Sequence, residues 1–446
     1  MNRQTLRVSD LIDNSPLSAL QIRVLLLCFL VVVLDGFDTA AIGYIAPELI
    51  RDWGITRGQL APAFAAGLFG MLVGSVGFGP VADRKGRKFV LLLSLGIVAL
   101  GTLACALAPN IEVLTALRFF TGLGLGGVLP NAITLSSEYS PARRRMLLVT
   151  LSYSGFTLGL ALGGWVAGLL LPLVGWKGLL LCGGLTPLVL LPALVLALPE
   201  STCFMAGSPA HAQRLRAILG RISARQDLDE VTLVGDVAAA QQRSPASTLF
   251  AEGRALRTLM LWLTFFCCLF VFYLLTSWLP TILRGSGYGT QETSHIAAMI
   301  PFGGVIGGIV MALLMDRFGA QRLLPPLCLC AAVALALTGT QLGNGLALLL
   351  MVFAVGFTLT GALNNLSILA ATLYPTHARA TGVSWALSAG RAGSIIGSLL
   401  GAWLFEAAGG LQVFFVWLAA PALLASLALF VMALRRAPGA ARGELA

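Results

Sequence analysis

The chain has 446 residues, of which 57% are hydrophobic and only 11% charged, and its mean hydropathy is +0.89. A soluble globular domain carries about 25% charged residues, so the composition excludes that class and predicts an all-α polytopic membrane protein. The net charge of +10 does not indicate nucleic-acid binding, because the Lys and Arg residues lie in short segments between apolar runs. Eight cysteines without a CxxC spacing predict neither a disulfide framework nor a metal site, and we expect no cofactor.

The apolar runs predict twelve transmembrane helices in two groups of six. Their approximate ranges are 22–46, 60–82, 90–108, 113–135, 147–171, 177–198, 257–282, 293–315, 323–341, 346–371, 381–405 and 411–434. We therefore predict an N-terminal six-helix bundle (1–198), a cytoplasmic connector (199–256) and a C-terminal six-helix bundle (257–446). Within the connector, 211–222 and 228–242 could each form a surface amphipathic helix, and we see no ligand chemistry there.

The distribution of Lys and Arg predicts the orientation in the membrane. With the N-terminus in the cytoplasm, the inward segments hold 23 of these residues, the outward segments hold four, and two lie within spans. This bias places both termini and the connector in the cytoplasm. The residues before the first apolar run are polar and show no pattern of a cleavable signal peptide.

An internal repeat relates the two halves. Asp83-Arg84-Lys85-Gly86 after the second span is matched 233 residues later by Asp316-Arg317-Phe318-Gly319 after the eighth. Tyr139 and Arg144 before the fifth span are matched 235 residues later by Tyr374 and Arg379 before the eleventh. Parallel six-span repeats predict a substrate site between the halves near the membrane midplane, with rocking as the transport motion.

The first span carries two carboxylates in its middle, Asp35 and Asp38. An acidic side chain at bilayer depth costs about 2.5–3.5 kcal/mol, so such residues usually face a protein interior or a water-filled path. Because they are three positions apart, they share one helical face, where two desolvated carboxylates cannot both ionise easily. One should then hold a proton near neutral pH, as a proton carrier requires. The alternative is a hydrogen-bonded pair that only packs helices.

The loop after the second span, GPVADRKGRK at 79–88, resembles the GxxxDRxGR[RK] signature of the major facilitator superfamily. Gly79 allows close contact between helices, and Gly86 allows a tight turn. The carboxylate of Asp83 can accept a hydrogen bond from an arginine, and Arg87 can form an ion pair with an acidic residue. The resemblance implies a cytoplasmic latch that stabilises the outward-facing state, whereas membrane topology alone would explain only the basic residues. We assign gating to Gly79, Asp83, Arg84, Gly86 and Arg87.

The second copy of this signature is degenerate. Ala312 stands where the first copy has Gly79, and Ala320 stands where it has Arg87. We include Asp316 and Arg317 among the gating residues and expect the second latch to be weaker.

Arg118 opens RFFTGLGLGG in the fourth span, which resembles the superfamily's RxxxGxG motif, whose arginine is associated with proton transfer. Its depth overlaps that of Asp35, so an Asp35–Arg118 pair is geometrically possible. A snorkelling arginine that reaches the outer surface is the alternative. In the fifth span, the glycines of 155–164 resemble the GxxxGPxxGG pattern of antiporters. Leu160 stands in place of the proline, so the pattern favours antiport only weakly.

Arg391 lies near the centre of the eleventh span, where arginine cannot lose its proton and needs an anionic partner. We expect that partner to be the substrate's carboxylate, held by two parallel hydrogen bonds. Pairing with Asp35 or Asp38 is the alternative. Further candidate substrate-binding residues, for which packing is an equal alternative, are Asn364, Asn365 and Tyr44.

The full set of motifs resembles the aromatic acid:proton symporter family. The resemblance rests on LDGFDTAAIGYIAPEL in the first span, DRKGRK, RFFTGLGLGGVLPNA, Glu138-Tyr139-Ser140-Pro141 with Arg143 to Arg145, and GRAGSIIG in the eleventh span. It implies uptake of small aromatic carboxylates such as benzoates and hydroxybenzoates, coupled to protons, in a bacterial inner membrane. We assign proton coupling to Asp35, Asp38, Arg118 and Glu138, and expect a monomer.

Three alternatives to this hypothesis are a different carrier of the same superfamily, a membrane enzyme and a sensor. A superfamily carrier of another organic acid, a sugar acid or a drug-like compound would share most of these motifs. A membrane enzyme would need a catalytic cluster, and none of the three histidines stands beside a buried acid. A sensor would usually carry a sizeable soluble output domain, which the short polar connector does not supply.

Overall fold

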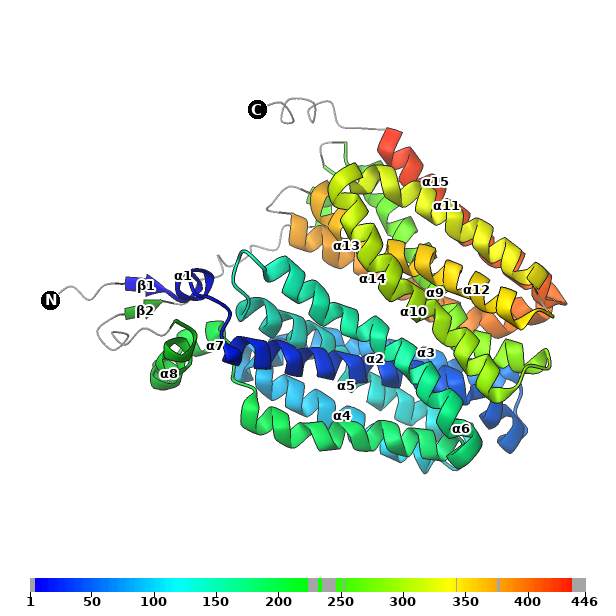
Figure 1. Ribbon diagram of the computed structural model, residues 1–446, viewed down its shortest axis with the longest axis horizontal. Helices are drawn as coiled ribbons and strands as arrows, with labels where there is room; N and C mark the ends of the chain where they lie inside the picture. The colour runs from blue at the N-terminus through cyan, green and yellow to red at the C-terminus, as the bar shows by residue number, and fades with distance from the viewer. Residues whose placement is uncertain are drawn as a thin grey trace. The chain divides into compact units, whose positions relative to one another are not determined.

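The computed structural model describes residues 5–223, 232–234, 246–251, 253–341, 343–374 and 378–434, nearly all of them helical (Figure 1). Contacts divide the chain into two units, which are described separately. Unit 1 comprises Met1–Gly54 and Pro62–Ala240, and unit 2 comprises Ile55–Ala61 and Gln241–Ala446.

Unit 1 contains five long helices, one of which is broken into two arms, together with four short helices and two short strands. Their bounds are β1 (Thr5–Arg7), α1 (Val8–Asp13), α2 (Ala19–Trp53), α3 (Arg57–Lys85, whose first residues belong to unit 2), α4 (Arg87–Ala106), α5 (Ile111–Glu138), α6 (Arg145–Ala197), α7 (Thr202–Ala206), η1 (Pro209–His211), α8 (Ala212–Ser223) and β2 (Thr232–Val234). The long helix α6 is broken at Gly175, which has φ 64° and ψ −174° and separates the fifth from the sixth predicted span.

Unit 2 repeats the pattern of long helices. Its elements are η2 (Ala246–Leu249), α9 (Ala255–Gly285), α10 (Thr290–Phe318), α11 (Ala320–Thr338), η3 (Gly339–Gln341), α12 (Gly345–Val355), η4 (Gly356–Thr360, a π-helical turn), α13 (Gly361–Leu373), α14 (Arg379–Ala408) and α15 (Leu411–Leu434). The tenth predicted span is α12, η4 and α13 in series.

The prediction of an all-α membrane protein with twelve spans is confirmed. In the described part of the chain, ten helical segments are long and apolar enough to cross a membrane, with both arms of α6 counted as one. The helix α14, which carries Arg391, lies outside that set but has 30 residues and covers the eleventh predicted span.

The connector fits the prediction only in part. The helix α8 lies where the first amphipathic helix was expected. The second expectation, a helix over 228–242, is wrong at Thr232–Val234, which is the strand β2. This strand pairs in parallel with β1, so backbone hydrogen bonds to a distant segment replace those of a helix. The rest of 228–242 lies outside the described residues.

The backbone carries the internal repeat. Glycines with positive φ occur in pairs at near-constant offsets: Gly54 and Gly287, Gly86 and Gly319, and Gly175 and Gly409. L-residues with a side chain rarely adopt this conformation, so the turns at equivalent places in the two halves both require glycine. Helix starts repeat as well, since the side chains of Asn110 and Asn344 cap α5 and α12.

Small residues bring neighbouring helices into backbone contact. In unit 1, a Cβ at Gly36 of α2 would meet the carbonyl of Phe156 of α6, and a Cβ at Gly159 would meet the carbonyl of Val33. In unit 2, a Cβ at Gly393 of α14 would likewise meet the carbonyl of Phe266 of α9. Glycine permits this approach, which stabilises helix pairs in lipid by close packing.

Candidate functional site

A buried ion pair joins α2 to α5 inside unit 1. Arg118 Nη1 donates to Asp38 Oδ2 at 3.0 Å, and Arg118 Nη2 donates to the Asp38 backbone carbonyl at 3.3 Å. The side chains are only 3% and 2% exposed. Thr102 of α4 donates to the other carboxylate oxygen, Oδ1. Both oxygens of Asp38 are therefore held, by residues of two different helices.

Arg118 pairs with Asp38 and not with Asp35, which corrects the pairing considered from the sequence. Asp35 is also buried in α2, 1% exposed, one turn away. Positions i and i+3 of a helix differ by about 60° around its axis, so the rotation of α2 decides which acid faces α5. That rotation is fixed by the contacts of Gly36 and Gly159 between α2 and α6.

The burial makes this pair sensitive to a change of charge. Removing one partner of a buried pair leaves an uncompensated charge and costs about 3–5 kcal/mol. A proton that binds Asp38 would remove the negative charge that faces Arg118.

Sequence reasoning did not single out Thr102, because a lone threonine inside an apolar run gives no signal of its own.

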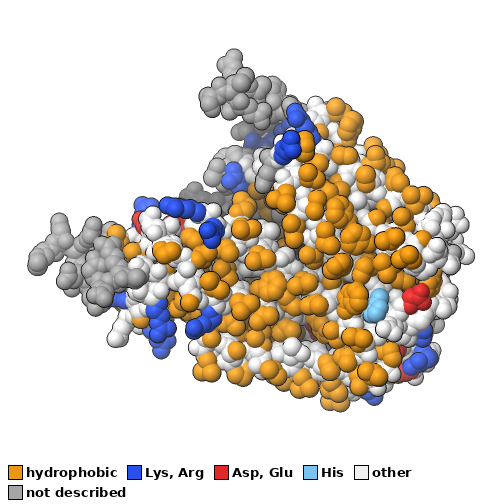
Figure 2. Space-filling model, in the orientation of Figure 1, with side chains coloured by type: hydrophobic (Ala, Val, Ile, Leu, Met, Phe, Trp, Pro, Cys, Tyr) orange, Lys and Arg blue, Asp and Glu red, His pale blue; other side chains and the backbone are white. Residues whose placement is uncertain are grey.

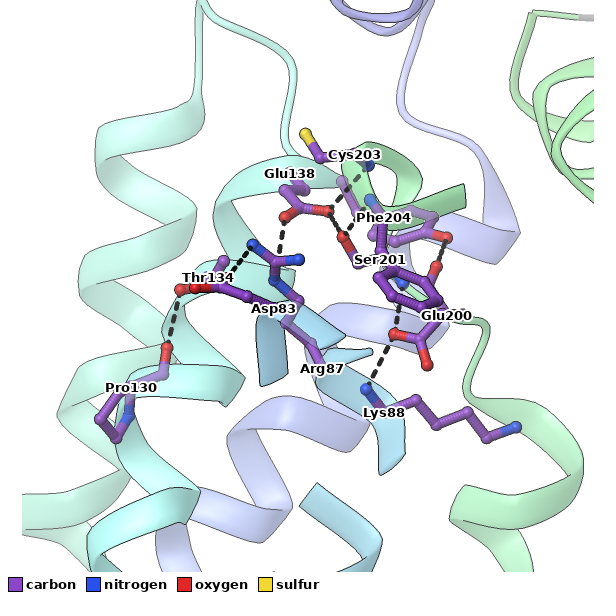
Figure 3. Close-up of polar contacts among 11 residues, drawn as sticks. Asp83, Arg87, Lys88, Pro130, Thr134, Glu138, Glu200, Ser201, Cys203 and Phe204 are labelled. Atoms are coloured by element: carbon purple, nitrogen blue, oxygen red, sulfur yellow. Dashed lines mark hydrogen bonds and ion pairs between the residues drawn. The ribbon is translucent and has the colours of Figure 1, made fainter. Parts of the chain in front are cut away.

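The second polar cluster lies where α3 and α5 end and where α4 and the segment after α6 begin (Figure 3). Arg87 Nη2, at the start of α4, donates to Asp83 Oδ1, near the end of α3, at 3.3 Å. Arg87 Nε also lies 3.9 Å from Glu138 Oε1 at the end of α5. Arg87 thus connects the loop after the second span to the end of the fourth span.

Glu138 belongs to this cluster and lies away from the Asp38–Arg118 ion pair, and its assignment to proton coupling stays a prediction. It lies twenty residues beyond Arg118 along α5, or about 30 Å. Its Oε2 accepts from Ser201 Oγ at 2.5 Å and from the Cys203 backbone N–H at 3.4 Å. The carboxylate therefore ties α5 to the start of α7.

Glu200, which the sequence analysis missed, holds the same region together. Its Oε1 accepts from the backbone N–H groups of Lys88 and Ser201, at 2.9 and 2.8 Å. Its backbone carbonyl accepts from the Tyr139 hydroxyl at 2.6 Å. Burial raises the pKa of Tyr139 well above its usual range, so the phenol stays protonated and can donate.

Two glycines of the first gating motif differ in their surroundings. Gly86 has φ 96°, as the expected tight turn requires, and a Cβ there would meet the Glu200 carboxylate. Gly79 does not make the close helix contact expected for it, because no described atom lies within 4 Å of where its Cβ would stand. The close approach of α3 to α5 occurs at Gly70 and Gly74 instead.

The other gating residues are placed as follows. Arg84 is exposed at the end of α3. In the second copy, Arg317 is exposed and its guanidinium lies 5.4 Å from the centre of the Phe318 ring. The backbone of Asp316 is part of α10, but its side chain lies outside the described residues.

The candidate substrate-binding residues lie in separate units. Tyr44 is buried in α2 of unit 1. In unit 2, Arg391 is half-buried in α14, and no ion pair involves it in the described part of the chain. Asn364 and Asn365 donate to the carbonyls of Gly304 and Gly308 in α10, so both amides pack helices together. The substrate-binding role of all four residues stays a prediction.

Among the described residues, no group of His, Cys, Asp or Glu could hold a metal ion.

The sequence is similar to a known protein family and to several named transporters. The sequence matches the Major Facilitator Superfamily over residues 28–366. The 4-hydroxybenzoate transporter PcaK of Pseudomonas aeruginosa is 44% identical over 432 residues, which are 97% of this chain and 96% of that protein. A gallate transporter of Pseudomonas putida is 42% identical over 428 residues, 95% and 94% of the two chains.

Among solved structures, the xylose transporter XylE from E. coli in a partially occluded inward open conformation matches with a TM-score of 0.72. The match covers 93% of this chain and 98% of that one at 16% identity, so it shows a common fold alone.

Proposed function

The chain belongs to the Major Facilitator Superfamily, and we propose that it imports small aromatic carboxylates, such as hydroxybenzoates, together with protons. It is a transporter rather than an enzyme. The names of its relatives, the 4-hydroxybenzoate and gallate transporters, support the substrate class.

The observation that carries the coupling is the buried ion pair of Asp38 and Arg118. When Asp38 is ionised, it compensates the charge of Arg118. When a proton neutralises Asp38, Arg118 loses that compensation, and a carboxylate anion becomes favourable nearby. Proton binding and anion binding then support each other, which is the thermodynamic requirement for symport.

Asp35 and Arg391 take further roles in the proposal. Asp35 shares the buried helix with Asp38 and modulates the same proton step. Arg391 holds the substrate carboxylate with its guanidinium, because a monoanion that leaves water needs a fixed cation. The amides of Asn364 and Asn365 and the hydroxyl of Tyr44 remain candidates for the ring substituents.

The second polar cluster, which contains Asp83, Arg87 and Glu138 and which we place on the cytoplasmic side, supplies the gate; it is called the cytoplasmic cluster below. The side chain of Asp83 is largely exposed, so its contact with Arg87 can break and re-form at small cost, whereas Arg87 and Glu138 are mostly buried. A latch of this kind shifts the population of conformations without touching the substrate. The corresponding segment with Asp316 and Arg317 is proposed as a weaker latch.

The remaining parts of the proposal concern location and organisation. The protein is a multi-pass membrane protein. Its bacterial relatives support a location in a bacterial inner membrane, and the Lys and Arg bias supports an orientation with both termini in the cytoplasm. We propose six-helix bundles at 1–198 and 257–446, joined by a connector at 199–256, and a functional monomer.

Uptake of labelled 4-hydroxybenzoate into cells, with and without a protonophore, tests this function. The proposal predicts accumulation that the protonophore abolishes, and competition by benzoate-type acids but not by aliphatic dicarboxylates or sugar acids. Competition by the aliphatic compounds alone would favour the alternative, a superfamily carrier of another organic acid.

A further inference from the structure

A cavity of about 810 Å³ lies beside the cytoplasmic cluster, in unit 1. The end of α3, the start of α4, the segment after α6 and the helix α8 line it. Five of its lining side chains are fixed cations: Arg84, Lys85, Lys88, Arg214 and Arg221. In Figure 2, Lys and Arg side chains gather at the end of unit 1 that carries α7 and α8, whereas the middle of that face is apolar.

The sequence of α8 builds one wall of this cavity. One face of the helix is buried against the unit through Leu215, Leu219 and Ile222. The residues that line the cavity recur at i, i+3, i+4 and i+7, so they form a second face. They are Arg214, Ala217, Ile218 and Arg221. Packing of the first face therefore fixes the direction of the two arginines.

The cavity carries a strong excess of positive charge. Glu200 is its only carboxylate lining residue in the described part of the chain. One oxygen of this carboxylate already accepts from the backbone N–H groups of Lys88 and Ser201. The charge of Lys88 is attracted by Glu200 and repelled more weakly by Arg214, and its Nζ donates to the Val195 carbonyl at 2.7 Å. A bound anion would relieve this repulsion.

The rest of the lining fits an amphiphile. Phe89 stands at the start of α4, where Lys85 Nζ lies 5.0 Å from the centre of its ring, and Ile218 adds apolar surface from α8. The enrichment of Lys and Arg in cytoplasmic loops explains why basic residues follow the spans. It does not explain why the separate helix α8 packs beside them and lines a cavity with them. Basic pockets at the cytoplasmic ends of transmembrane helices are suited to anionic headgroups.

We propose that this cavity binds a phosphate-bearing anion, with the headgroup of an anionic phospholipid of the inner leaflet as its occupant. The phosphate lies between the arginines of α8 and the basic residues of the α3–α4 turn, and links them. This assignment is independent of the transported substrate. The sequence analysis expected no ligand chemistry in the connector, and this proposal revises that expectation. The helix α8 supplies only half of the site, and the α3–α4 turn, more than a hundred residues earlier, supplies the rest.

The test measures binding of dioctanoyl phosphatidylglycerol to the purified full-length protein in detergent by calorimetry, with dioctanoyl phosphatidylcholine as the zwitterionic reference. We expect the double variant R214Q/R221Q to bind the anionic lipid about tenfold more weakly or worse. The variant A217E, which places an anion in the cavity at an exposed position, should lose binding in the same way.

The matched control is R143Q/R144Q, which removes two exposed arginines of unit 1 that do not line the cavity. It should bind within about twofold of the wild type. A second titration in millimolar inorganic phosphate identifies the source of the anion: displacement indicates a soluble phosphate, and no displacement indicates the lipid. Wild-type affinity in both cavity variants, or an equal loss in the control, would overturn the proposal.

Discussion

The guanidinium of Arg118 and the carboxylate of Asp38 form a 3.0 Å ion pair that is almost completely buried, with Thr102 on the other carboxylate oxygen. A pair in this position has two separable effects, one on folding and one on charge coupling. Substitutions at the two residues separate these effects.

The stability of unit 1 should depend on both charges together. We expect Asp38→Asn and Arg118→Gln each to destabilise the protein by about 3–5 kcal/mol, because each leaves one buried charge alone. The double variant should recover much of that loss, since neither charge remains. Thermal unfolding of the four proteins in detergent measures the cycle. Strictly additive losses would mean that the two side chains do not interact.

Gly36 should tolerate no side chain, because its Cβ would meet the Phe156 carbonyl of α6. We expect Gly36→Ala to lower the unfolding temperature and to impair transport by moving α2 relative to α6. The control is Gly96→Ala in α4, where no described atom lies within 4 Å of the added Cβ. There, alanine should be neutral or stabilise by up to about 1 kcal/mol through helix propensity. Equal effects at both sites would contradict the close crossing.

The polar cluster of Asp83, Arg87 and Glu138 should control the transport rate and not the affinity for substrate. We expect Arg87→Ala and Asp83→Asn to reduce the transport rate while substrate binding stays within a few-fold, since the cluster acts on the population of states. Glu138→Gln should behave in the same way, because Glu138 contacts Arg87 and Ser201. Uptake rates and equilibrium binding, measured on the same preparations, provide the comparison. Loss of binding in parallel with transport would identify the loop as structural.

Arg391 should recognise the carboxylate of the substrate. Arg391→Ala should lose nearly all binding, by about 2–5 kcal/mol, as expected when a buried charge loses its partner. Arg391→Lys keeps the charge but not the two parallel hydrogen bonds, so weak transport should remain. The readout is binding of 4-hydroxybenzoate against its uncharged amide. An alanine variant that still prefers the acid would transfer this role to another cation, with Arg118 as the next candidate.

The sequence predicted the helices and the repeat well, because both depend on local signals. Runs of apolar residues determine the spans, and Asn110 and Asn344 mark helix starts by their side-chain chemistry alone. The importance of the acids in α2 was also visible, since a carboxylate inside an apolar run conflicts with its surroundings.

The partners of these residues were less predictable. Which acid meets Arg118 depends on the rotation of α2, and that rotation follows from glycine contacts with a helix more than a hundred residues away. Glu138 and Glu200 each end or follow an apolar run, where a charged residue is ordinary. Only the convergence of helix ends in the fold brings them to Arg87 and Lys88.

The most direct test of the account is transport of labelled 4-hydroxybenzoate by Asp38→Asn in proteoliposomes, measured in two modes. The variant resembles a permanently protonated Asp38, so it should still exchange internal for external substrate but should not accumulate substrate when a pH gradient is imposed. Wild-type protein and Asp35→Asn, which should lose accumulation at least partly, are measured beside it. Accumulation by Asp38→Asn that equals the wild type would contradict the claim that this carboxylate couples protons to uptake.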